Sequence, residues 1–470
     1  MMVLFAVGCS GSETSALEPG QQEETDARPN IIFILADDLD LASAQQMPKL
    51  RSVLTEEGAS FENAFLSYPL CCPSRATILT GLYAHNHRVA GNEPPSGGFE
   101  KFHEQGLEES TIAARLQKEG YRTALFGKYL NHYPGDDPTY VPPGWDEWHA
   151  NANIDGEEFT RYYGYTLNEN GELVPYGNSP KDYLTDVISR QASDFVQHAA
   201  SDSEPFFLYL APAAPHDPAT PAERHKDAFA DEKAPRSASF DEEDVSDKPP
   251  WIRQIRHISD RQAFREIDSR YRERLASLLA VDDMLESLVE ELESTDQLDN
   301  TFIFFASDNG WQQGEHRIKS GKLYPYEESI RTPLFVRGPG IPAGSKVEKL
   351  ILNTDFAPTF ADLAGVSLPA DGRSFAPLLR GEDPPWRSEA LLEAAGGGSP
   401  PSYEAVRTET HKYVEYQTGD RELYDLEADP YEMDNLYETA DASLVQDLKA
   451  KLDALRECTG DECREAEDAS

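Results

Sequence analysis

Four short runs of apolar residues recur along the chain, and polar or charged side chains follow each run at once. The runs cover residues 30–36, 123–126, 206–210 and 301–306. Near-continuous apolar segments of this length predict strands that are buried on both faces, as in a parallel sheet. Ligands of open α/β sheets gather beyond the carboxyl ends of the strands. The residues after each run are therefore candidates for a functional site.

Helical periodicity appears between these runs. From position 271 to 292, apolar residues recur at helical spacing and acidic residues occupy the other face, which predicts a helix with its apolar side in the core. The apolar positions are Tyr271, Leu275, Leu278, Leu285, Leu288 and Leu292. Segment 219–250 is polar, with several prolines and a charged run, and predicts a long surface insertion.

The pattern changes in the last quarter of the chain. Residues 405–416 and 421–426 are predicted as short strands of a hairpin across Thr418-Gly419-Asp420. A helix is predicted to follow from about residue 442 to residue 455. This part of the chain is expected to form a smaller unit of its own.

Composition limits the classes of function. The 470 residues are 39% hydrophobic, which is enough to bury a core, so the chain is not a disordered acidic protein. Acidic residues outnumber basic ones 85 to 42, for a net charge of −43. This charge argues against nucleic acids and anionic membrane surfaces as partners. An anionic ligand would need a local basic island on this acidic molecule.

The N-terminus and the cysteines indicate export. Residues 3–9 form a short apolar run that ends in Cys9 and resembles the end of a bacterial lipoprotein signal peptide. The polar residues 10–28 suit a tether between a lipid-modified Cys9 and a folded domain. We expect an extracytoplasmic protein, either secreted or held at the cell surface by the lipid at Cys9 alone. Cys458 and Cys463 flank a short polar turn and are either a small disulfide or two free thiols.

Hard oxygen donors follow two of the predicted strands. Asp37-Asp38 come after the first run, and Asp308-Asn309 come after the last. Carboxylate and amide oxygens suit Ca²⁺. The absence of a Cys/His ligand cluster argues against zinc. An acidic pair at the end of a strand more often caps a helix, so the metal site depends on the remaining motifs.

The most specific motif is an eleven-residue segment: Cys71-Cys72-Pro73-Ser74-Arg75-Ala76-Thr77-Ile78-Leu79-Thr80-Gly81. It resembles the signature of the formylglycine-dependent sulfatases, a family of the alkaline phosphatase superfamily. The resemblance implies that a formylglycine-generating enzyme oxidises Cys71, rather than Cys72, to formylglycine before the chain folds. It also implies one Ca²⁺ ion. The implied metal ligands are Asp37, Asp38, Asp308, Asn309 and the modified Cys71.

The family chemistry explains why such a modification is needed. A hydrated aldehyde carries two hydroxyl groups on one carbon. One attacks sulfur, and the other then expels sulfate by elimination and restores the aldehyde, whereas a serine would retain a stable sulfate ester. Pro73 suits the first turn of a helix whose positive end faces the anion. Arg75 has forked donors that can hold oxygens on the nucleophile and metal side.

Further motifs follow the order of the family. Gly127-Lys128 and Gly321-Lys322 resemble the segments whose lysines bind the sulfate. Ala214-Pro215-His216 resembles the segment whose histidine contacts the ester and protonates the leaving group. The resemblance therefore assigns sulfate binding to Lys128 and Lys322, and general acid catalysis to His216.

Two further histidines are candidate site residues. Many arylsulfatases carry a histidine two residues after the first lysine, where this chain has Leu130. His132 is the candidate replacement, as the base that drives elimination. His316 is either a substrate-binding residue or a histidine of a surface loop.

Within the family, several stretches resemble the N-acetylglucosamine-6-sulfatase branch and favour a sulfated sugar over a small aryl sulfate. They are His85-Asn86-His87 beside the signature, Pro143-Gly144-Trp145, Tyr163-Gly164-Tyr165-Thr166-Leu167 and Asp182-Tyr183-Leu184-Thr185-Asp186. Other readings stay open: an arylsulfatase, or a phosphonate monoester hydrolase or phosphodiesterase of the same superfamily. A non-enzymatic alternative is a surface glycan-binding protein with an inactive site.

The resemblance also implies the architecture. We expect an α/β catalytic domain over residues 29–366, built on a large, mixed, mostly parallel sheet flanked by helices. A smaller α+β subdomain on an antiparallel sheet, with an acidic tail, is expected over residues 367–470. Residues 1–28 are expected to be the signal-like segment and the tether.

Overall fold

A computed structural model describes residues 28–154, 162–201 and 204–468. The predicted lipid attachment at Cys9 and most of the tether lie outside these residues. Within them, no helix is both long enough and apolar enough to cross a membrane.

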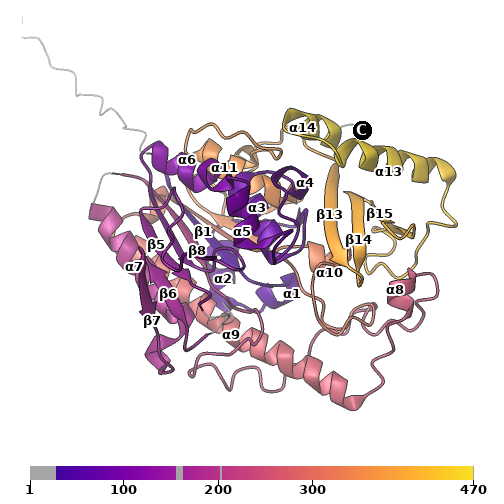
Figure 1. Ribbon diagram of the computed structural model, residues 1–470, viewed down its shortest axis with the longest axis horizontal. Coiled ribbons are helices and arrows are strands. Elements are labelled where there is room, and N and C mark those ends of the chain that lie inside the picture. Colours follow the sequence, from indigo (N-terminus) through magenta and orange to yellow (C-terminus); the bar gives the residue numbers. More distant parts are fainter. Residues whose placement is uncertain (1–27, 155–161, 202–203, 469–470) are drawn as a thin grey trace, which may run out of the picture.

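A ten-stranded mixed sheet forms the centre of the larger domain (Figure 1). Its strand order is β11-β2-β10-β9-β1-β8-β4-β5-β6-β7. The strands are β1 (Asn30–Ala36), β2 (Ala59–Phe61), β4 (Arg122–Gly127), β5 (Glu147–Asn151), β6 (Thr166–Glu169), β7 (Glu172–Pro175), β8 (Phe206–Ala211), β9 (Thr301–Ser307), β10 (Leu334–Arg337) and β11 (Ser345–Val347). The short strands β3 (Ala64–Phe65) and β12 (Ile351–Leu352) pair separately.

The four strands predicted from apolar runs are β1, β4, β8 and β9, and all four are present. They are neighbours in the order β9-β1-β8-β4, and each adjacent pair is parallel. Their carboxyl ends therefore meet at one edge of the sheet, as a functional site at that edge requires.

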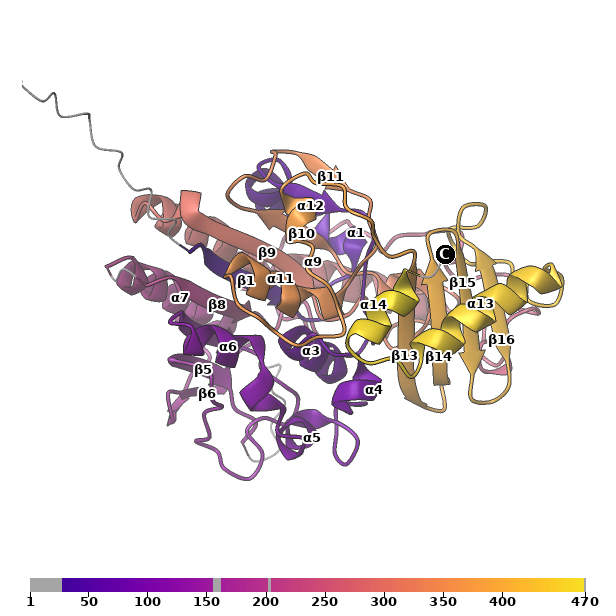
Figure 2. The ribbon, with the colours of Figure 1, turned by 90° about the horizontal axis from the view of Figure 1, so that it is seen from above.

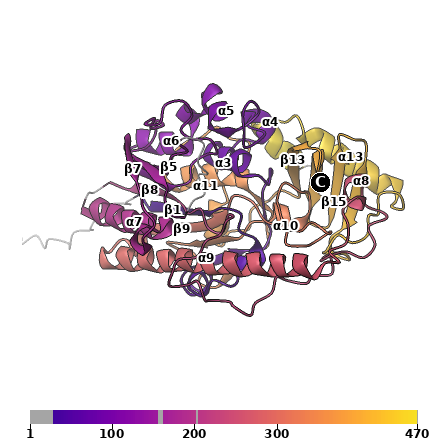
Figure 3. The ribbon, with the colours of Figure 1, turned by 60° about the horizontal axis from the view of Figure 1, so that its bottom comes forward.

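Helices cover both faces of the sheet, and β1 shows why. Ile32 and Ile34 pack into one apolar cluster with α7 (Leu184–Ser201) and α9 (Arg261–Ser294), the long helix along the bottom of Figure 3. The alternate residues of β1 pack on the opposite face. The helices on that face are α3 (Cys71–Thr80), α6 (Ile112–Lys118) and α11 (Phe356–Leu363). Side chains that alternate along a strand thus serve two cores.

Shorter elements connect these layers. The short helices are α1 (Leu41–Ala44), α2 (Pro48–Leu50), α4 (Ala84–His87), α5 (Gly98–Glu104), α8 (Pro250–Arg253), α10 (Glu327–Ile330) and α12 (Ala376–Leu379). Single π or 3₁₀ turns are η1 (Arg51–Thr55), η2 (Leu107–Ser110), η3 (Pro180–Asp182), η4 (Leu298–Asn300) and η5 (Asn353–Asp355).

A four-stranded antiparallel sheet forms the C-terminal subdomain, and α13 lies across its strands (Figure 2). The elements are β13 (Glu389–Gly397), β14 (Pro401–Thr408), β15 (His411–Tyr416), β16 (Arg421–Asp425), α13 (Ala442–Leu455) and α14 (Asp461–Glu467). The predicted helix and the hairpin between β15 and β16 are confirmed. The single strand predicted over 405–416 is wrong, because the Thr408 hydroxyl accepts hydrogen bonds from the backbone N–H groups of Thr410 and His411 and turns the chain there.

Segment 219–249 contains no helix or strand, as expected for an insertion. It is nevertheless anchored to the body of the protein. Glu242 and Lys248 are buried, and Lys248 Nζ donates to the backbone carbonyl of Met433, 2.8 Å away in the C-terminal subdomain. The segment therefore packs between the larger domain and the C-terminal subdomain rather than lying wholly on the surface.

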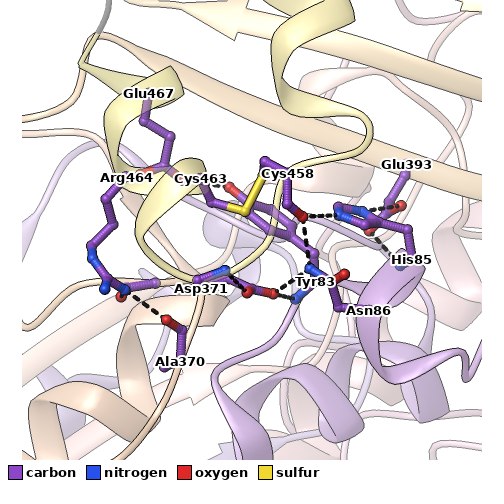
Figure 4. The surroundings of a disulfide bond; sticks show 12 residues. Tyr83, His85, Asn86, Ala370, Asp371, Glu393, Cys458, Cys463, Arg464 and Glu467 are labelled. Atoms are coloured by element: carbon purple, nitrogen blue, oxygen red, sulfur yellow. Dashed lines mark hydrogen bonds and ion pairs between the residues drawn. A yellow bond between two sulfur atoms is a disulfide. The ribbon is translucent and has the colours of Figure 1, made fainter.

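Cys458 and Cys463 form a disulfide, which confirms that alternative (Figure 4). The carbonyl oxygen of Cys458 accepts a hydrogen bond of 2.9 Å from the Asn86 side chain. Asp371 accepts hydrogen bonds from the Tyr83 N–H group and from Asn86, both 2.8 Å long. The disulfide corner thus packs against the turn that follows α3.

Candidate active site

The loops after β1, β4, β8 and β9 and the first turn of α3 converge at one edge of the sheet. Asp38, directly after β1, has a left-handed backbone (φ 67°), which aspartate tolerates better than most residues. Its N–H group donates to Asp308 Oδ1 at 3.1 Å, and Asn309 Nδ2 donates to Asp38 Oδ1 at 2.7 Å. These bonds fix the loop after β1 against the loop after β9.

Cys71 is the first residue of α3, and its side chain has no exposed surface. Its sulfur lies 3.5 Å from Asp37 Oδ1 and 3.9 Å from Asp38 Oδ1. Burial raises the pKa of the Cys71 thiol to about 12, so the unmodified side chain is a neutral thiol and a poor nucleophile at neutral pH. Cys72 faces away into the apolar core, as a packing residue would.

Three cationic side chains surround Cys71. Lys322 Nζ lies 2.7 Å from the Cys71 sulfur and forms a short ion pair with Asp38. Lys128 Nζ, 1% exposed, lies 2.6 Å from Asp37 Oδ2. Arg75 is fully buried and donates from Nε to Asp308 Oδ2 at 2.8 Å. The sequence predicted all three cations, and the structure brings them together around Cys71, each paired with a carboxylate.

The same cations keep the carboxyl groups ionised. Burial alone would raise the pKa of Asp37, but the nearby Lys128 and His216 outweigh it and hold that pKa below its ordinary value. The pKa of Asp38 is lowered in the same way: burial opposes the shift, and Lys322 contributes most to it. Both carboxylates therefore remain available as anionic ligands at neutral pH.

The residues at this edge fit a hard cation. Ligand atoms of Asp37, Asp38, Cys71 and His216 lie within 4.8 Å of one another. Asp38 Oδ2 and Asn309 Oδ1 are buried and have no hydrogen-bond partner among the described residues. Buried oxygens of this kind are costly unless another group binds them. With Asp308 and Asn309, which are hydrogen-bonded to Asp38, oxygens from four residues outnumber the Cys71 sulfur and the His216 nitrogen, and this majority of oxygen ligands suits Ca²⁺.

His216 lies at the rim of this site. Its Nδ1 forms a hydrogen bond of 2.7 Å with the carbonyl oxygen of Asp217, and its Nε2 lies 3.6 Å from Asp38 Oδ2. Its side chain is 23% exposed, so it can meet a substrate that enters from solvent. The position suits proton donation to a leaving group.

The other two histidines are placed differently. His132 is half-buried in the turn after β4, and among the described residues no hydrogen bond or ion pair joins its ring to Cys71. Its role as a base stays a prediction. His316 is not on a surface loop, because its side chain is fully buried and bonded to Glu242. A buried ring of this kind offers no open face to a substrate.

Arg274 supports the site and was missed from the sequence. It lies on α9, is fully buried, and donates to the Pro215 carbonyl at 3.2 Å and to the Asp38 carbonyl. It therefore ties the loop of Asp38 to the loop of His216. The available signal was a lone basic residue on the apolar face of the helix, three positions after Tyr271.

Comparisons with known proteins identify the family. A family model described as sulfatase matches residues 29–366, and one described as N-sulphoglucosamine sulphohydrolase, C-terminal, matches residues 314–458. The N-acetylglucosamine-6-sulfatase of Capra hircus is 36% identical, over 93% of this chain and 85% of the goat protein.

Solved structures show the same fold. A protein in complex with its substrate D-glucosamine-2-N,6-O-disulfate matches with a TM-score of 0.79 and 26% identity, over 94% of this chain and all of that one. The phosphonate monoester hydrolase of Agrobacterium radiobacter shares the fold at a TM-score of 0.69 and 22% identity, over 90% of this chain and 94% of its own. With the family model covering most of the chain, this protein belongs to the sulfatase family and is a sulfuric ester hydrolase.

Proposed function

We propose that the protein releases sulfate from a sulfated sugar, with N-acetylglucosamine 6-sulfate as the preferred unit, through a formylglycine made from Cys71. One observation carries the reaction: the Cys71 side chain lies between Asp37, 3.5 Å away, and Lys322, 2.7 Å away. This contact supports a reacting atom held between metal-side oxygens and a sulfate-binding cation. The identity to an N-acetylglucosamine-6-sulfatase and the likeness to a protein that holds a glucosamine disulfate support the sugar.

The burial of Cys71 supports oxidation before folding. A fully buried thiol at the start of a packed helix is not accessible to a second enzyme. A formylglycine-generating enzyme would therefore act on the unfolded chain. The hydrated aldehyde supplies one hydroxyl for attack on sulfur and a second for expulsion of sulfate.

The surrounding residues bind the sulfate and stabilise the charge that develops on it. Lys128, Lys322 and Arg75 are held by carboxylates before the substrate arrives, so their positive charges need little rearrangement. Asp37, Asp38, Asp308 and Asn309 would hold Ca²⁺, which when bound supplies positive charge beside the nucleophile and the sulfate oxygens.

Proton transfers accompany both halves of the cycle. The attacking hydroxyl gives up its proton as its oxygen bonds to sulfur, the S–O bond to the sugar breaks, and His216 gives its proton to the leaving sugar oxygen. A base then takes the proton of the second hydroxyl, the C–O bond to sulfate breaks and the carbonyl forms again, and a water molecule adds to the carbonyl to restore the two hydroxyls. His132 is our candidate base.

We also propose an extracytoplasmic place of action, with Cys9 as the point of lipid attachment. The disulfide between Cys458 and Cys463 supports this, because disulfides persist mainly in oxidising compartments.

A substrate panel tests the proposed function. Matured enzyme should release sulfate from N-acetylglucosamine 6-sulfate faster than from the 3-sulfated isomer or from an aryl sulfate. It should also cleave 4-nitrophenyl sulfate faster than the matched phosphate and phosphonate esters. Faster cleavage of the phosphorus esters would instead favour the phosphonate hydrolase alternative, and sulfate release from none of the compounds would favour a binding protein.

His216→Gln should slow the sugar substrate much more than an activated aryl sulfate. A sugar alkoxide is a poor leaving group and needs a proton, whereas 4-nitrophenolate leaves without one. We expect kcat on the sugar sulfate to fall about 100- to 10,000-fold. The measurement is kcat for both substrates, with His225→Gln as a control, since His225 pairs with Asp283 outside the site. An equal loss on both substrates would show that His216 does not donate the proton.

A further inference from the structure

A second group of side chains that could hold a metal ion lies where the catalytic domain meets the C-terminal subdomain; two of its three residues are buried and Glu328 is half-buried. One ring nitrogen of His316 and one carboxylate oxygen each of Glu328 and Glu432 lie within 4.8 Å of one another. Glu328 belongs to α10, which stands beside the C-terminal sheet in Figures 1 and 3, and Glu432 follows β16. None of the three is among the residues around Cys71.

His316 is held in the orientation of a metal ligand. Its Nδ1 is 2.7 Å from Glu242 Oε2, and its ring stacks on Tyr326 with centroids 4.0 Å apart. Because Nδ1 is engaged, Nε2 is the nitrogen left to bind a metal. This atom is buried and has no hydrogen-bond partner among the described residues. A carboxylate on one ring nitrogen is the usual support of a histidine whose other nitrogen binds a metal.

The two carboxylates also have spare binding capacity. Glu328 Oε1 accepts from the Ser239 hydroxyl at 3.2 Å, while its Oε2 is buried without a hydrogen-bond partner among the described residues. No lysine or arginine of the residues that the structure describes forms an ion pair with Glu328. Glu432, 1% exposed, accepts from the Glu327 N–H group at 2.8 Å and pairs with Lys412. Glu328 has no such cation, and because a carboxylate with a buried, uncompensated oxygen is costly, a bound cation would stabilise it.

We propose that His316, Glu328 and Glu432 bind one divalent transition-metal ion, with Zn²⁺ as the best candidate. An imidazole nitrogen with two carboxylate oxygens suits Zn²⁺, whereas Ca²⁺ prefers oxygen ligands alone. The two carboxylate charges balance the charge of the ion, and a water molecule completes four ligands. When the ion binds Glu432, Lys412 still has Glu327, 3.5 Å away, as an ion-pair partner.

The site would have a structural role that reaches the catalytic centre. His316 and Glu328 flank the segment that carries Lys322, so an ion bound to both closes that segment into a loop. Glu432 fastens the closed loop to the C-terminal subdomain. The ion would thus fix the position of the lysine that contacts Cys71, without itself touching the substrate.

Metal binding to the matured, calcium-saturated enzyme tests the proposal. We expect one equivalent of Zn²⁺ to bind per chain, measured by equilibrium dialysis with elemental analysis. Glu328→Gln keeps the shape but removes a charged ligand, and should weaken zinc binding at least about tenfold. Glu389→Gln is the matched control, because Glu389 is a buried carboxyl that pairs with Lys451 and lies outside the ligand set. Asp38→Asn should leave the zinc equivalent in place.

A second measurement needs no variant. Zinc at a hundredfold excess over its Kd should raise the Tm of the calcium-saturated enzyme by about 3 °C. Cobalt in place of zinc should give the visible bands of a four- or five-coordinate ion with nitrogen and oxygen ligands. The proposal is overturned if zinc neither binds at one equivalent nor raises the Tm. It is also overturned if Glu328→Gln binds zinc as tightly as the unaltered enzyme, or if Asp38→Asn loses the zinc.

Discussion

Cys71→Ala should abolish sulfate release, with a fall in kcat on the order of a million-fold, the loss expected when a nucleophile is removed. Alanine leaves the buried cations and carboxylates in place but offers no atom to attack sulfur. Cys71→Ser should differ in an informative way. A serine can attack once but has no second hydroxyl to expel sulfate, so at most one sulfo group per chain should accumulate. Sulfate release and intact mass measure the two outcomes.

The neighbouring cysteine provides the control for this experiment. Cys72→Ala changes the same atom type one position along α3, but in the apolar core. We expect it to keep most of the activity and to lose about 1–2 kcal/mol of stability from the small cavity. Full activity in Cys71→Ala, or loss of activity in Cys72→Ala protein that is folded, would contradict the assignment of Cys71.

Lys322→Ala should lower kcat/KM by about 100- to 1,000-fold, the loss typical of removing one group that stabilises transition-state charge. The Lys322 ammonium contacts both Cys71 and Asp38, so it is next to the place where the proposed reaction adds charge to the sulfate oxygens. Removing Lys322 also leaves less positive charge near the buried Asp38 to balance its negative charge. The measurement is steady-state kinetics on the sugar sulfate at saturating calcium.

Lys319 lies on the same segment and is exposed, so Lys319→Ala removes a charge of the same sign without reaching the site. We expect its kcat/KM to stay within about twofold of the unaltered enzyme. Equal losses in both variants would mean that the net charge of the segment, rather than the contact of Lys322 with the centre, governs the rate.

The strands and the central site were predictable because their signals are local. Apolar runs revealed β1, β4, β8 and β9, and the polar residues after them include most of the groups around Cys71. Arg274 could not be assigned in this way, since only the tertiary fold shows that its guanidinium reaches the Asp38 carbonyl.

His316 and Glu432 illustrate a second limit. They lie on segments far apart in the chain, and nothing in either segment indicates the other. The turn between β14 and β15 shows a third limit, because both flanking segments favour strands and only a Thr408 side-chain bond separates them.

The position of the disulfide has a consequence for which cysteines pair during folding. Cys458 and Cys463 are five positions apart, whereas Cys71 stands 387 positions before Cys458 (458 minus 71). Closing the longer loop costs about 4 kcal/mol more chain entropy. The C-terminal thiols therefore find each other long before either meets Cys71. A local bridge of this kind keeps the cysteines of the corner in Figure 4 from pairing with Cys71, whose sulfur must stay free if it is oxidised as we propose.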